Sequence, residues 1–370
     1  ARSWLDPDDA TRREAIERLP AELGCTPEMV AWGIEAAFEA VTPEALRRWW
    51  DREGAASQAP PGLSAHIHAS NVFVAGLPPV LASVLAGVPA LIKAPSEHPT
   101  FAALFARSVA EHAPELGPCV GAAAWGRHDQ HTTQALLRAA DVAFVFGDDA
   151  SVAQVRALAP DGLRVLGFGH RVSVAVIPAA TPITDLLLDA LALDALAWDG
   201  AGCLTPRWIL VEGDLARAVA FARGAAERAP AVAAALPAIP LAAAEGAARA
   251  QYLGLAGFAG FVAHGPGWVV SAQPALDPAP PPRTLCFVPV PGLSAVSGVL
   301  APLGPALQGV ALGGGPDPDS DVPGPHGLPV PGPLLPLHAL GLSLLTRPGR
   351  LQRPPLDWNH DDVRILAALR

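Results

Sequence analysis

Between residues 63 and 166 the sequence alternates short β-prone runs with helical stretches, and this alternation restricts the fold more than any other feature. The helical stretches cover 78–86, 100–112, 131–140 and 150–158. The β-prone runs cover 63–67, 90–93, 119–123, 142–146 and 163–166. Strands joined by single helices form βαβ units, which require parallel pairing. The pattern therefore predicts a parallel sheet, with a nucleotide site at the carboxyl ends of its strands.

A second alternation of strands and helices follows Arg171. Helices are also expected before the first alternating region, which begins at residue 63. After Arg171 we expect strands at 172–177 and 208–211 and helices at 182–196 and 214–228. Before residue 60 we expect one helix at 8–19 and another that begins at Thr42-Pro43, with a breaker-rich link at 54–62. Pro- and Gly-rich stretches at 274–282 and 315–336 are typical of loops. The sequence thus predicts a first domain at 1–170, a second at 171–345 and a tail at 346–370.

Composition excludes several classes of function. The formal charge of −10 leaves no basic stripe for a nucleic acid. Apolar runs are broken by Asp or Pro before they reach membrane-spanning length, as Asp189 and Asp194 break the run 186–198. No metal site is expected, because His66 and His68 alternate on a strand without further ligand spacing. The four cysteines are scattered without a CxxC, which favours reduced thiols and a cytoplasmic location.

One of these cysteines has a context suited to catalysis. Cys203 lies in Asp199-Gly-Ala-Gly-Cys-Leu-Thr-Pro206, a glycine-rich loop between an apolar helix and a strand. Such a loop lets a thiol approach a substrate and can offer the backbone N–H of the cysteine to an oxyanion. A small buried cysteine with a packing role is the alternative. Local context alone does not separate the two.

Five segments, in order along the chain, resemble segments of aldehyde dehydrogenases. They are Ile67-His-Ala-Ser-Asn71, Leu91-Ile-Lys93-Ala-Pro-Ser-Glu-His-Pro99, Phe144-Val-Phe-Gly147-Asp, the Cys203 loop, and Leu285-Cys-Phe287-Val-Pro-Val290. The resemblance implies an α/β fold with a parallel-sheet cofactor domain and an α/β catalytic domain. In this order, it implies an oxyanion amide (Asn71), an adenosine-ribose contact (Lys93), a turn beneath the cofactor phosphates (Gly147), the nucleophile (Cys203) and a contact near the nicotinamide ribose (Phe287).

Within that superfamily the chain resembles acyl-CoA reductases, the family that includes the fatty-acid reductase of bacterial luminescence. The discriminating segments are Gly169-His-Arg-Val-Ser173, the loop from Trp198 to Cys203, and Pro355-Leu-Asp-Trp-Asn-His-Asp361. Hydrolytic aldehyde dehydrogenases carry a Glu where this chain has Phe168 or Gly169, and no carboxylate is near in the sequence. That Glu activates water against the thioacyl enzyme, a step that thioester reduction does not need. The missing Glu therefore favours reduction or CoA-dependent chemistry.

The resemblance implies that Cys203 carries the acyl group of an acyl-CoA or acyl-carrier substrate, and that hydride from a nicotinamide releases an aldehyde. His170 is the best candidate acid or base, and a strand-end histidine bonded to backbone is the alternative. Ser96 falls where relatives that prefer NAD often carry Glu, which favours NADPH over NADH, although Glu97 is adjacent.

Two alternative functions remain open at this stage. One is a CoA-acylating aldehyde dehydrogenase that works oxidatively, and the other is a non-catalytic nucleotide-binding partner protein. The tail is expected to return to the cofactor domain or to contact a second copy in a homodimer. We expect a structural salt link at His360-Asp361, and a core or interface role for Trp49 and Trp50.

Overall fold

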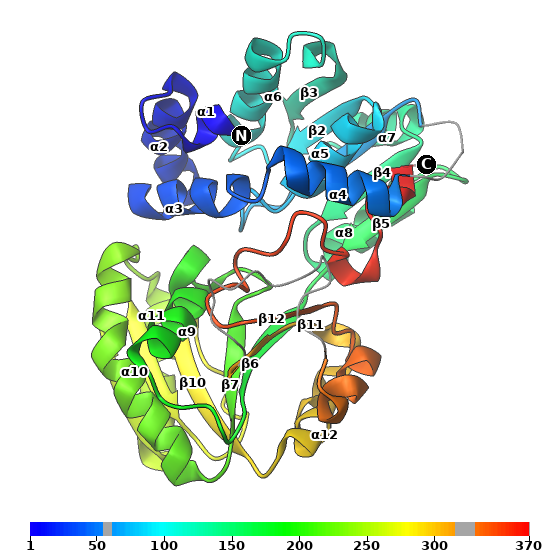
Figure 1. Ribbon diagram of the computed structural model, residues 1–370. Helices are drawn as coiled ribbons and strands as arrows, with labels where there is room; N and C mark the ends of the chain where they lie inside the picture. The colour runs from blue at the N-terminus through cyan, green and yellow to red at the C-terminus, as the bar shows by residue number, and fades with distance from the viewer. Residues whose placement is uncertain (55–60, 315–329, 370) are drawn as a thin grey trace. The chain divides into compact units, whose positions relative to one another are not determined.

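The computed structural model describes residues 1–54, 61–314 and 330–369. The chain divides into two units (Figure 1). Unit 1 comprises Ala1–His170 and Pro355–Arg370, and unit 2 comprises Arg171–Pro354. The chain therefore leaves unit 1 once and returns to it at its C-terminal end. Because strand β12 (Leu344–Thr346) pairs within unit 2, the return begins at Pro355 and not at residue 346.

Unit 1 contains a five-stranded sheet in the order β3-β2-β1-β4-β5, in which every neighbouring pair is parallel. The strands are β1 (Ser64–Ile67), β2 (Ala90–Ala94), β3 (Val120–Ala124), β4 (Val142–Phe146) and β5 (Arg164–Phe168). The connecting helices are α5 (Leu77–Ala86), α6 (Thr100–His112), α7 (Gln130–Ala139) and α8 (Asp149–Leu158). The parallel sheet predicted from the alternating pattern is confirmed, and the bounds of these elements differ by at most two residues from those expected.

The inner strand β4, which lies between β1 and β5, shows why this sheet forms. Its residues are all buried, but they alternate between two cores. Phe144 and Phe146 pack in the core that contains α5, whereas Ala143 and Val145 pack in the core that contains α7 and α8. A strand with an apolar core on each face needs apolar residues at every position, which explains its uninterrupted Val-Ala-Phe-Val-Phe sequence.

Four helices precede the sheet: α1 (Arg2–Leu5), α2 (Ala10–Leu23), α3 (Pro27–Phe38) and α4 (Pro43–Glu53). The start of α4 is as expected, because the Thr42 side chain accepts a hydrogen bond from the Ala45 N–H and Pro43 follows it. Helix α3 was missed, although Thr26-Pro27 carries the same signal and Thr26 caps Met29 in the same way. Trp4 of α1 stacks on Phe38 of α3 at 5.0 Å, which joins these helices.

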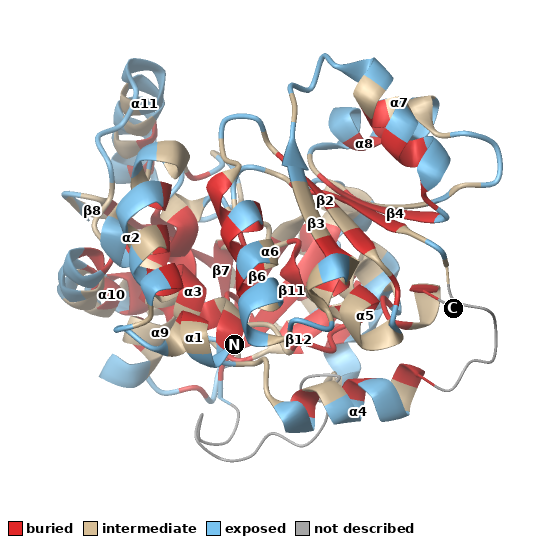
Figure 2. Cartoon of the chain, turned by 90° about the horizontal axis from the view of Figure 1, so that it is seen from above, coloured by how far each residue is buried: buried red, intermediate tan, exposed pale blue. Residues whose placement is uncertain are grey.

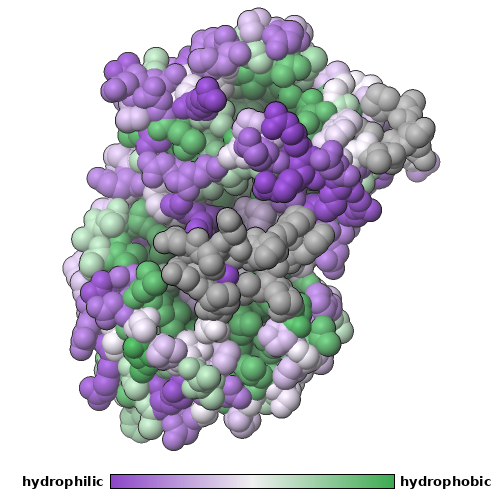
Figure 3. All heavy atoms as spheres, viewed as in Figure 1, coloured by the Kyte–Doolittle hydropathy of each residue, from purple (hydrophilic) through white to green (hydrophobic). Residues whose placement is uncertain are grey.

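The tail packs on α4 within unit 1. Its apolar side chains Leu356, Ile365, Leu366 and Leu369 are in one core with Trp49. Arg52 of α4 forms an ion pair with Asp357 at 2.9 Å. The opposite face of α4 carries charged side chains, which form a hydrophilic area in Figure 3, and Trp50 is partly exposed there. The apolar side chains of the tail are therefore buried against unit 1 of the same chain.

Unit 2 contains a seven-stranded sheet in the order β12-β11-β6-β7-β10-β9-β8, in which only the β8–β9 pair is antiparallel. Its remaining strands are β6 (Val172–Ile177), β7 (Pro206–Glu212), β8 (Phe261–Gly265), β9 (Trp268–Ala272), β10 (Thr284–Val290) and β11 (Leu307–Leu312). Its α-helices are α9 (Asp185–Leu196), α10 (Leu215–Ala235), α11 (Ala243–Ala259) and α12 (Val296–Leu300). Figure 2 shows α11 as largely exposed, in contrast to the buried β6 and β7.

Several local expectations for unit 2 need correction. Helix α9 begins at Asp185 and not at 182, because Thr184 caps it. Helix α10 continues through Pro230 to Ala235, beyond the expected end at 228. Within the stretch 315–336, residues 315–329 lie outside the described part of the chain, and Gly332–Leu340 forms 3-10 turns instead of a loop. No helix among the described residues combines the length and hydrophobicity that a membrane crossing requires.

Candidate active site

Four of the residues selected from the sequence gather at the carboxyl edge of the unit 1 sheet. Asn71 follows β1, Lys93 and Ser96 lie at and after the end of β2, and Gly147 follows β4. Strands β1 and β4 are neighbours, although β2 and β3 come between them in the sequence. Such a reversal of strand order opens a crevice at the carboxyl ends, where α/β sheets bind ligands. These four residues therefore surround the position that the topology favours for a nucleotide.

Lys93 is held at this edge by its surroundings. It is buried near the end of β2, and its Nζ lies 5.9 Å from the centroid of the Trp125 ring. Burial lowers the pKa of the Lys93 ammonium, and the negative charge of Glu97 opposes this change. A cation on a rigid strand end next to an aromatic ring has few rotamers to lose when it binds a hydroxyl group.

Ser96 and Glu97 are both exposed beside Lys93. The pKa of the Glu97 carboxyl is lowered, first by a hydrogen bond to its own backbone and then by one to the Ser96 side chain. Ser96 and Glu97 therefore interact with each other, and the charge of Lys93 also acts on Glu97. These two exposed side chains thus form one interacting pair at the end of β2.

Gly147 makes the turn after β4 tight. Its N–H donates to the Phe168 carbonyl at 3.2 Å, and a Cβ there would lie 3.1 Å from the Ser151 Cβ. A side chain at this position would fill the space above the start of α8, so Gly147 fits a turn that a phosphate approaches. The N-terminus of α8 contributes less to such a phosphate site, because the Asp148 carboxylate already accepts a hydrogen bond from the Ser151 N–H there.

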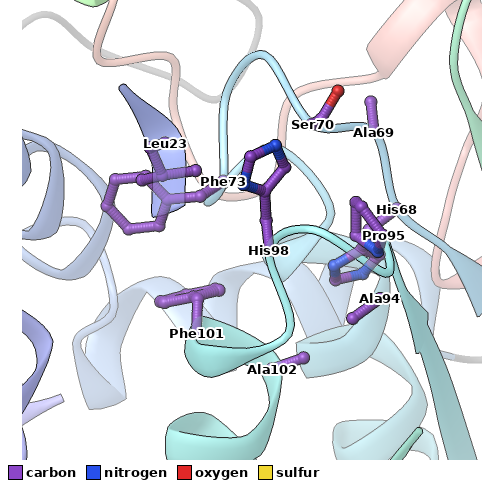
Figure 4. Close-up of a pocket in the computed structure, with 10 residues that line it drawn as sticks. All are labelled: Leu23, His68, Ala69, Ser70, Phe73, Ala94, Pro95, His98, Phe101 and Ala102. Carbon is purple, nitrogen blue, oxygen red and sulfur yellow. The ribbon is translucent and has the colours of Figure 1, made fainter. Parts of the chain in front are cut away.

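A small hollow lies beside these loops, between β1, β2 and α6 (Figure 4). Figure 4 shows the ring of His98 between Phe73 on one side and His68 and Pro95 on the other. His68 Nε2 and His98 Nδ1 are buried without a hydrogen-bond partner. Burial lowers the pKa of His68 to about 4, so this imidazole is neutral at physiological pH.

His170 is exposed and ends unit 1, and its backbone N–H donates to Asp149 Oδ1 at 3.0 Å. The stretch 167–171 contains no carboxylate of its own, but the fold brings Asp149 beside it. The Asp149 side chain, from the first turn of α8, also occupies the space that a Cβ at Gly169 would need. A carboxylate thus lies beside this stretch, although it is far away in the sequence and is engaged by a backbone N–H.

The end of the tail adds an imidazole to the same edge of unit 1. The His360 ring stacks on Trp358, with centroids 4.5 Å apart, and contacts Phe168 at 4.5 Å and Phe146 at 5.6 Å. Phe146 and Phe168 are the last residues of β4 and β5. Aromatic packing therefore contributes to the position of His360.

Cys203 lies on a loop of unit 2 between α9 and β7, and it is half-buried and not in a disulfide. The loop begins with three consecutive left-handed residues, Trp198 (φ 56°), Asp199 (φ 52°) and Gly200 (φ 73°). This conformation is unfavourable for residues with a Cβ and persists only where the surroundings impose it. A Cβ at Gly200 would lie 2.6 Å from the Arg283 backbone nitrogen, so only glycine fits there.

Arg283 imposes this conformation. The guanidinium pairs with Asp199 at 2.8 Å and donates to the carbonyls of Leu196 at 3.0 Å, Leu236 at 2.7 Å and Gly267. Burial raises the pKa of the Asp199 carboxyl, and the Arg283 charge opposes that rise. One buried cation thus connects the start of the Cys203 loop to the ends of α9 and α10 and to the β8–β9 turn. Sequence reasoning missed Arg283, because nothing nearby in the sequence marks its partners.

Phe287 does not lie where the resemblance suggested. It is fully buried in the middle of β10 and stacks on Phe221 of α10 at 6.2 Å. A side chain with no exposed surface offers no face to a cofactor. Among the residues that the structure describes, no group of His, Cys, Asp and Glu side chains is arranged to hold a metal ion.

Residues 1–320 match the family model described as acyl-CoA reductase (LuxC). The chain belongs to this family. It is also 25% identical over 233 residues to a long-chain acyl-protein thioester reductase from Aliivibrio fischeri, an alignment that covers 57% of this chain and 48% of that protein. The chain therefore spans about half the length of this curated relative.

Solved structures show where the acyl-CoA reductase (LuxC) family fits among folds. An NAD-dependent benzaldehyde dehydrogenase from Corynebacterium glutamicum matches 96% of this chain and 78% of its own, with a TM-score of 0.65 and 16% identity. Aldehyde dehydrogenase 21 from Physcomitrella patens matches 100% of this chain and 82% of its own, with a TM-score of 0.69 and 10% identity. The aldehyde dehydrogenase-like α/β fold implied by the resemblance is confirmed.

Proposed function

We propose that this member of the acyl-CoA reductase (LuxC) family reduces an acyl thioester to an aldehyde, with Cys203 as the residue that carries the acyl group. The observation that supports this most is the strained loop that Arg283 holds in front of Cys203. A cysteine that only fills space needs no left-handed residues before it. A nucleophile does need a fixed backbone, because the reacting atoms must meet within a narrow range of geometry.

The first half of the reaction needs only groups of this chain. The Cys203 thiolate attacks the thioester carbon, and the new C–S bond leaves a negative charge on the oxygen. The Cys203 N–H, and by resemblance the Asn71 side-chain amide, donate hydrogen bonds to that oxygen. Collapse breaks the bond to the thiol carrier and leaves an acyl-Cys203 thioester. By resemblance and chemistry, His170 is the proposed group that takes the proton from the Cys203 thiol or gives one to the leaving thiolate.

A nicotinamide cofactor fits the carboxyl edge of unit 1. Lys93 would hold the adenosine ribose, and the turn at Gly147 would lie beneath the phosphates. When bound, the nicotinamide supplies the hydride that converts the acyl group to an aldehyde. We propose NADPH over NADH, because the Ser96 side chain can donate to a 2′-phosphate. The donor is an acyl-CoA or a carrier-bound acyl group, and the absence of disulfides supports a cytoplasmic setting.

The proposal predicts that the acyl-enzyme persists when no cofactor is present. A positioned base in a hydrolytic relative accelerates deacylation by about 10²–10⁴-fold. Here the carboxylate beside residues 167–171 is Asp149, which a backbone N–H engages. After a pulse of radiolabelled acyl-CoA, we expect label to stay on Cys203 and to leave as aldehyde only when NADPH is added.

Two variants serve as controls for this experiment. Cys203→Ala should take up no label, and Asp149→Asn should retain label for as long as the wild type does. Rapid release of free fatty acid without cofactor would contradict the reductase proposal. If that rapid release of fatty acid disappears in Asp149→Asn, Asp149 is the hydrolytic base. If the rapid release continues in Asp149→Asn, His170 is the candidate.

A further inference from the structure

The Cys203 carbonyl is held by a buried hydroxyl group from another strand. Ser173, near the start of β6, has no exposed surface. Its hydroxyl donates to the Cys203 carbonyl oxygen at 2.9 Å and accepts from the Gly309 N–H of β11 at 3.1 Å. One side chain thus connects the central part of the unit 2 sheet to the backbone of the nucleophile. These contacts all lie within unit 2.

The sheet is irregular on both sides of Ser173. Toward β7 the register shifts, so that Ser173 pairs with Pro206 but Val174 pairs with Trp208. Toward β11 it shifts between Leu307 and Val310. Each shift leaves backbone groups without a regular ladder partner, and Pro206 has no N–H to donate. A buried polar backbone group without a partner costs about 1–3 kcal/mol. The Ser173 hydroxyl satisfies two such groups, the Gly309 N–H and the Cys203 carbonyl.

The side chains around Gly309 are closely packed, and a residue larger than glycine would disturb them. A Cβ at Gly309 would lie 2.9 Å from Ser173 Oγ and 3.0 Å from the Leu204 Cδ2. Any larger residue at 309 would push the hydroxyl, Leu204 or Leu351 aside. Leu204 is the next residue after Cys203, so such a shift would also move the nucleophile.

We propose that Ser173 is a positioning residue for the nucleophile, an inference that rests on the proposed role of Cys203. By holding the Cys203 carbonyl, Ser173 fixes the peptide plane that follows the Cys203 Cα. It thereby constrains the direction of the Cys203 Cα–Cβ bond, which carries the thiol. Arg283 holds the start of the same loop, and Ser173 holds the loop at the nucleophile itself. The hydroxyl bonds to the carbonyl and not to the sulfur, so its effect is on geometry and not on the acidity of the thiol.

The test compares two reactions of the same thiol in Ser173→Ala. Acylation by a bound acyl-CoA needs the sulfur in one orientation, whereas alkylation by iodoacetamide tolerates many. We expect Ser173→Ala to slow single-turnover acylation of Cys203 by roughly 10- to 100-fold. Alkylation of Cys203, followed by peptide mapping, should keep its rate and its pH profile. Ser173→Thr keeps the hydroxyl, so we expect it to acylate at nearly the wild-type rate even if the extra methyl lowers stability.

Ser271→Ala is the matched control. Ser271 is also fully buried in the unit 2 sheet, but its hydroxyl bonds to Tyr252 at 2.7 Å, away from the nucleophile loop. It should lose stability like Ser173→Ala and keep its acylation rate. If Ser173→Ala does not fold, Gly309→Ala is the second variant, because it keeps the hydroxyl group but crowds both it and Leu204, and we expect slower acylation there too.

The outcomes separate this inference from the proposed function. Absence of acyl label at Cys203 in the wild type overturns the proposed function, and this inference with it. A labelled wild type with equally fast acylation in Ser173→Ala overturns the positioning role alone. A shifted alkylation pH profile in Ser173→Ala also overturns it, because Ser173 would then act on thiol acidity.

Discussion

At the residue scale, we propose that the positions just after β2 set the preference between the two nicotinamide cofactors. Ser96 and Glu97 are adjacent and exposed, and each has a different consequence for a cofactor. A hydroxyl can donate to a 2′-phosphate, whereas a carboxylate repels it and accepts from a 2′-hydroxyl. Because the Ser96 side chain hydrogen-bonds to the Glu97 carboxylate, a change at one position also alters the other.

We predict that Ser96→Glu shifts cofactor preference from NADPH toward NADH. A lost charge-assisted hydrogen bond, together with a new repulsion, corresponds to a change of roughly 10- to 100-fold in the ratio of kcat/KM values. Steady-state kinetics with both cofactors measure this ratio. Glu97→Gln is the comparison: a large change there, with none in Ser96→Glu, would show that Glu97 is the residue that faces the ribose.

At the scale of elements, the loop between α9 and β7 depends on a cation supplied just before β10. Arg283 reaches Asp199 and three backbone carbonyls from four different parts of unit 2. Most surface ion pairs contribute little, but removal of one partner from a buried pair leaves an uncompensated charge. Arg283 is therefore expected to matter far more than an arginine on the surface of the same unit.

We predict that Arg283→Met lowers the free energy of unfolding by roughly 3–5 kcal/mol. The folded fraction should also acylate Cys203 more slowly, because the left-handed residues lose their support. Arg228→Met is the control, since Arg228 pairs with Asp189 at 2.6 Å in a partly exposed site. The loss of stability in this control should be much smaller than in Arg283→Met, because an ion pair in contact with solvent contributes little. Urea denaturation measures both, and equal losses would contradict the role assigned to Arg283.

At the scale of the whole molecule, a buried carboxyl makes stability depend on pH. Asp194 of α9 is fully buried, and its Oδ2 accepts from the Gly349 N–H at 2.7 Å. Its backbone carbonyl accepts from the Gln352 side chain at 2.9 Å. Burial raises the pKa of Asp194 to about 7, although hydrogen bonds from the backbone of Gly349, Gln352 and Leu351 and the charge of Arg350 oppose the rise. Asp194 thus fastens the segment through which the chain leaves unit 2.

The sign of the pH effect follows from this raised pKa. The folded state binds the Asp194 proton more tightly than the unfolded state does, so the contribution of Asp194 is fully present at low pH and is lost as the pH rises through about 7. Asn at position 194 cannot ionise. We therefore predict that the free energy of unfolding of Asp194→Asn, relative to that of the wild type, rises by on the order of 2–3 kcal/mol between pH 5 and pH 8. Urea unfolding of both proteins at several pH values measures the difference. A constant difference would show that the pKa is not raised.

The helices and strands of the unit 1 sheet, and the residues that follow its strands at the carboxyl edge, could be predicted from the sequence alone. These features depend on local pattern: Val142–Phe146 is apolar at every position because both faces are covered, and Thr42-Pro43 starts a helix through its own side chain and ring. Local signals were overlooked at Thr26-Pro27. The exposed, alanine-rich α11 offers only a weak pattern, because it buries few of its residues.

Which distant residues come into contact could not be predicted from the sequence and is seen in the folded chain. The fold brings Asp149 against the backbone of His170, Arg283 to Asp199, and Ser173 to the Cys203 carbonyl, and it buries Phe287 in the core. The partners in these contacts are 21 residues apart or more. Their meeting depends on strand register and on bulges in the ladder, which a periodic pattern does not specify because every register that buries the same face satisfies it.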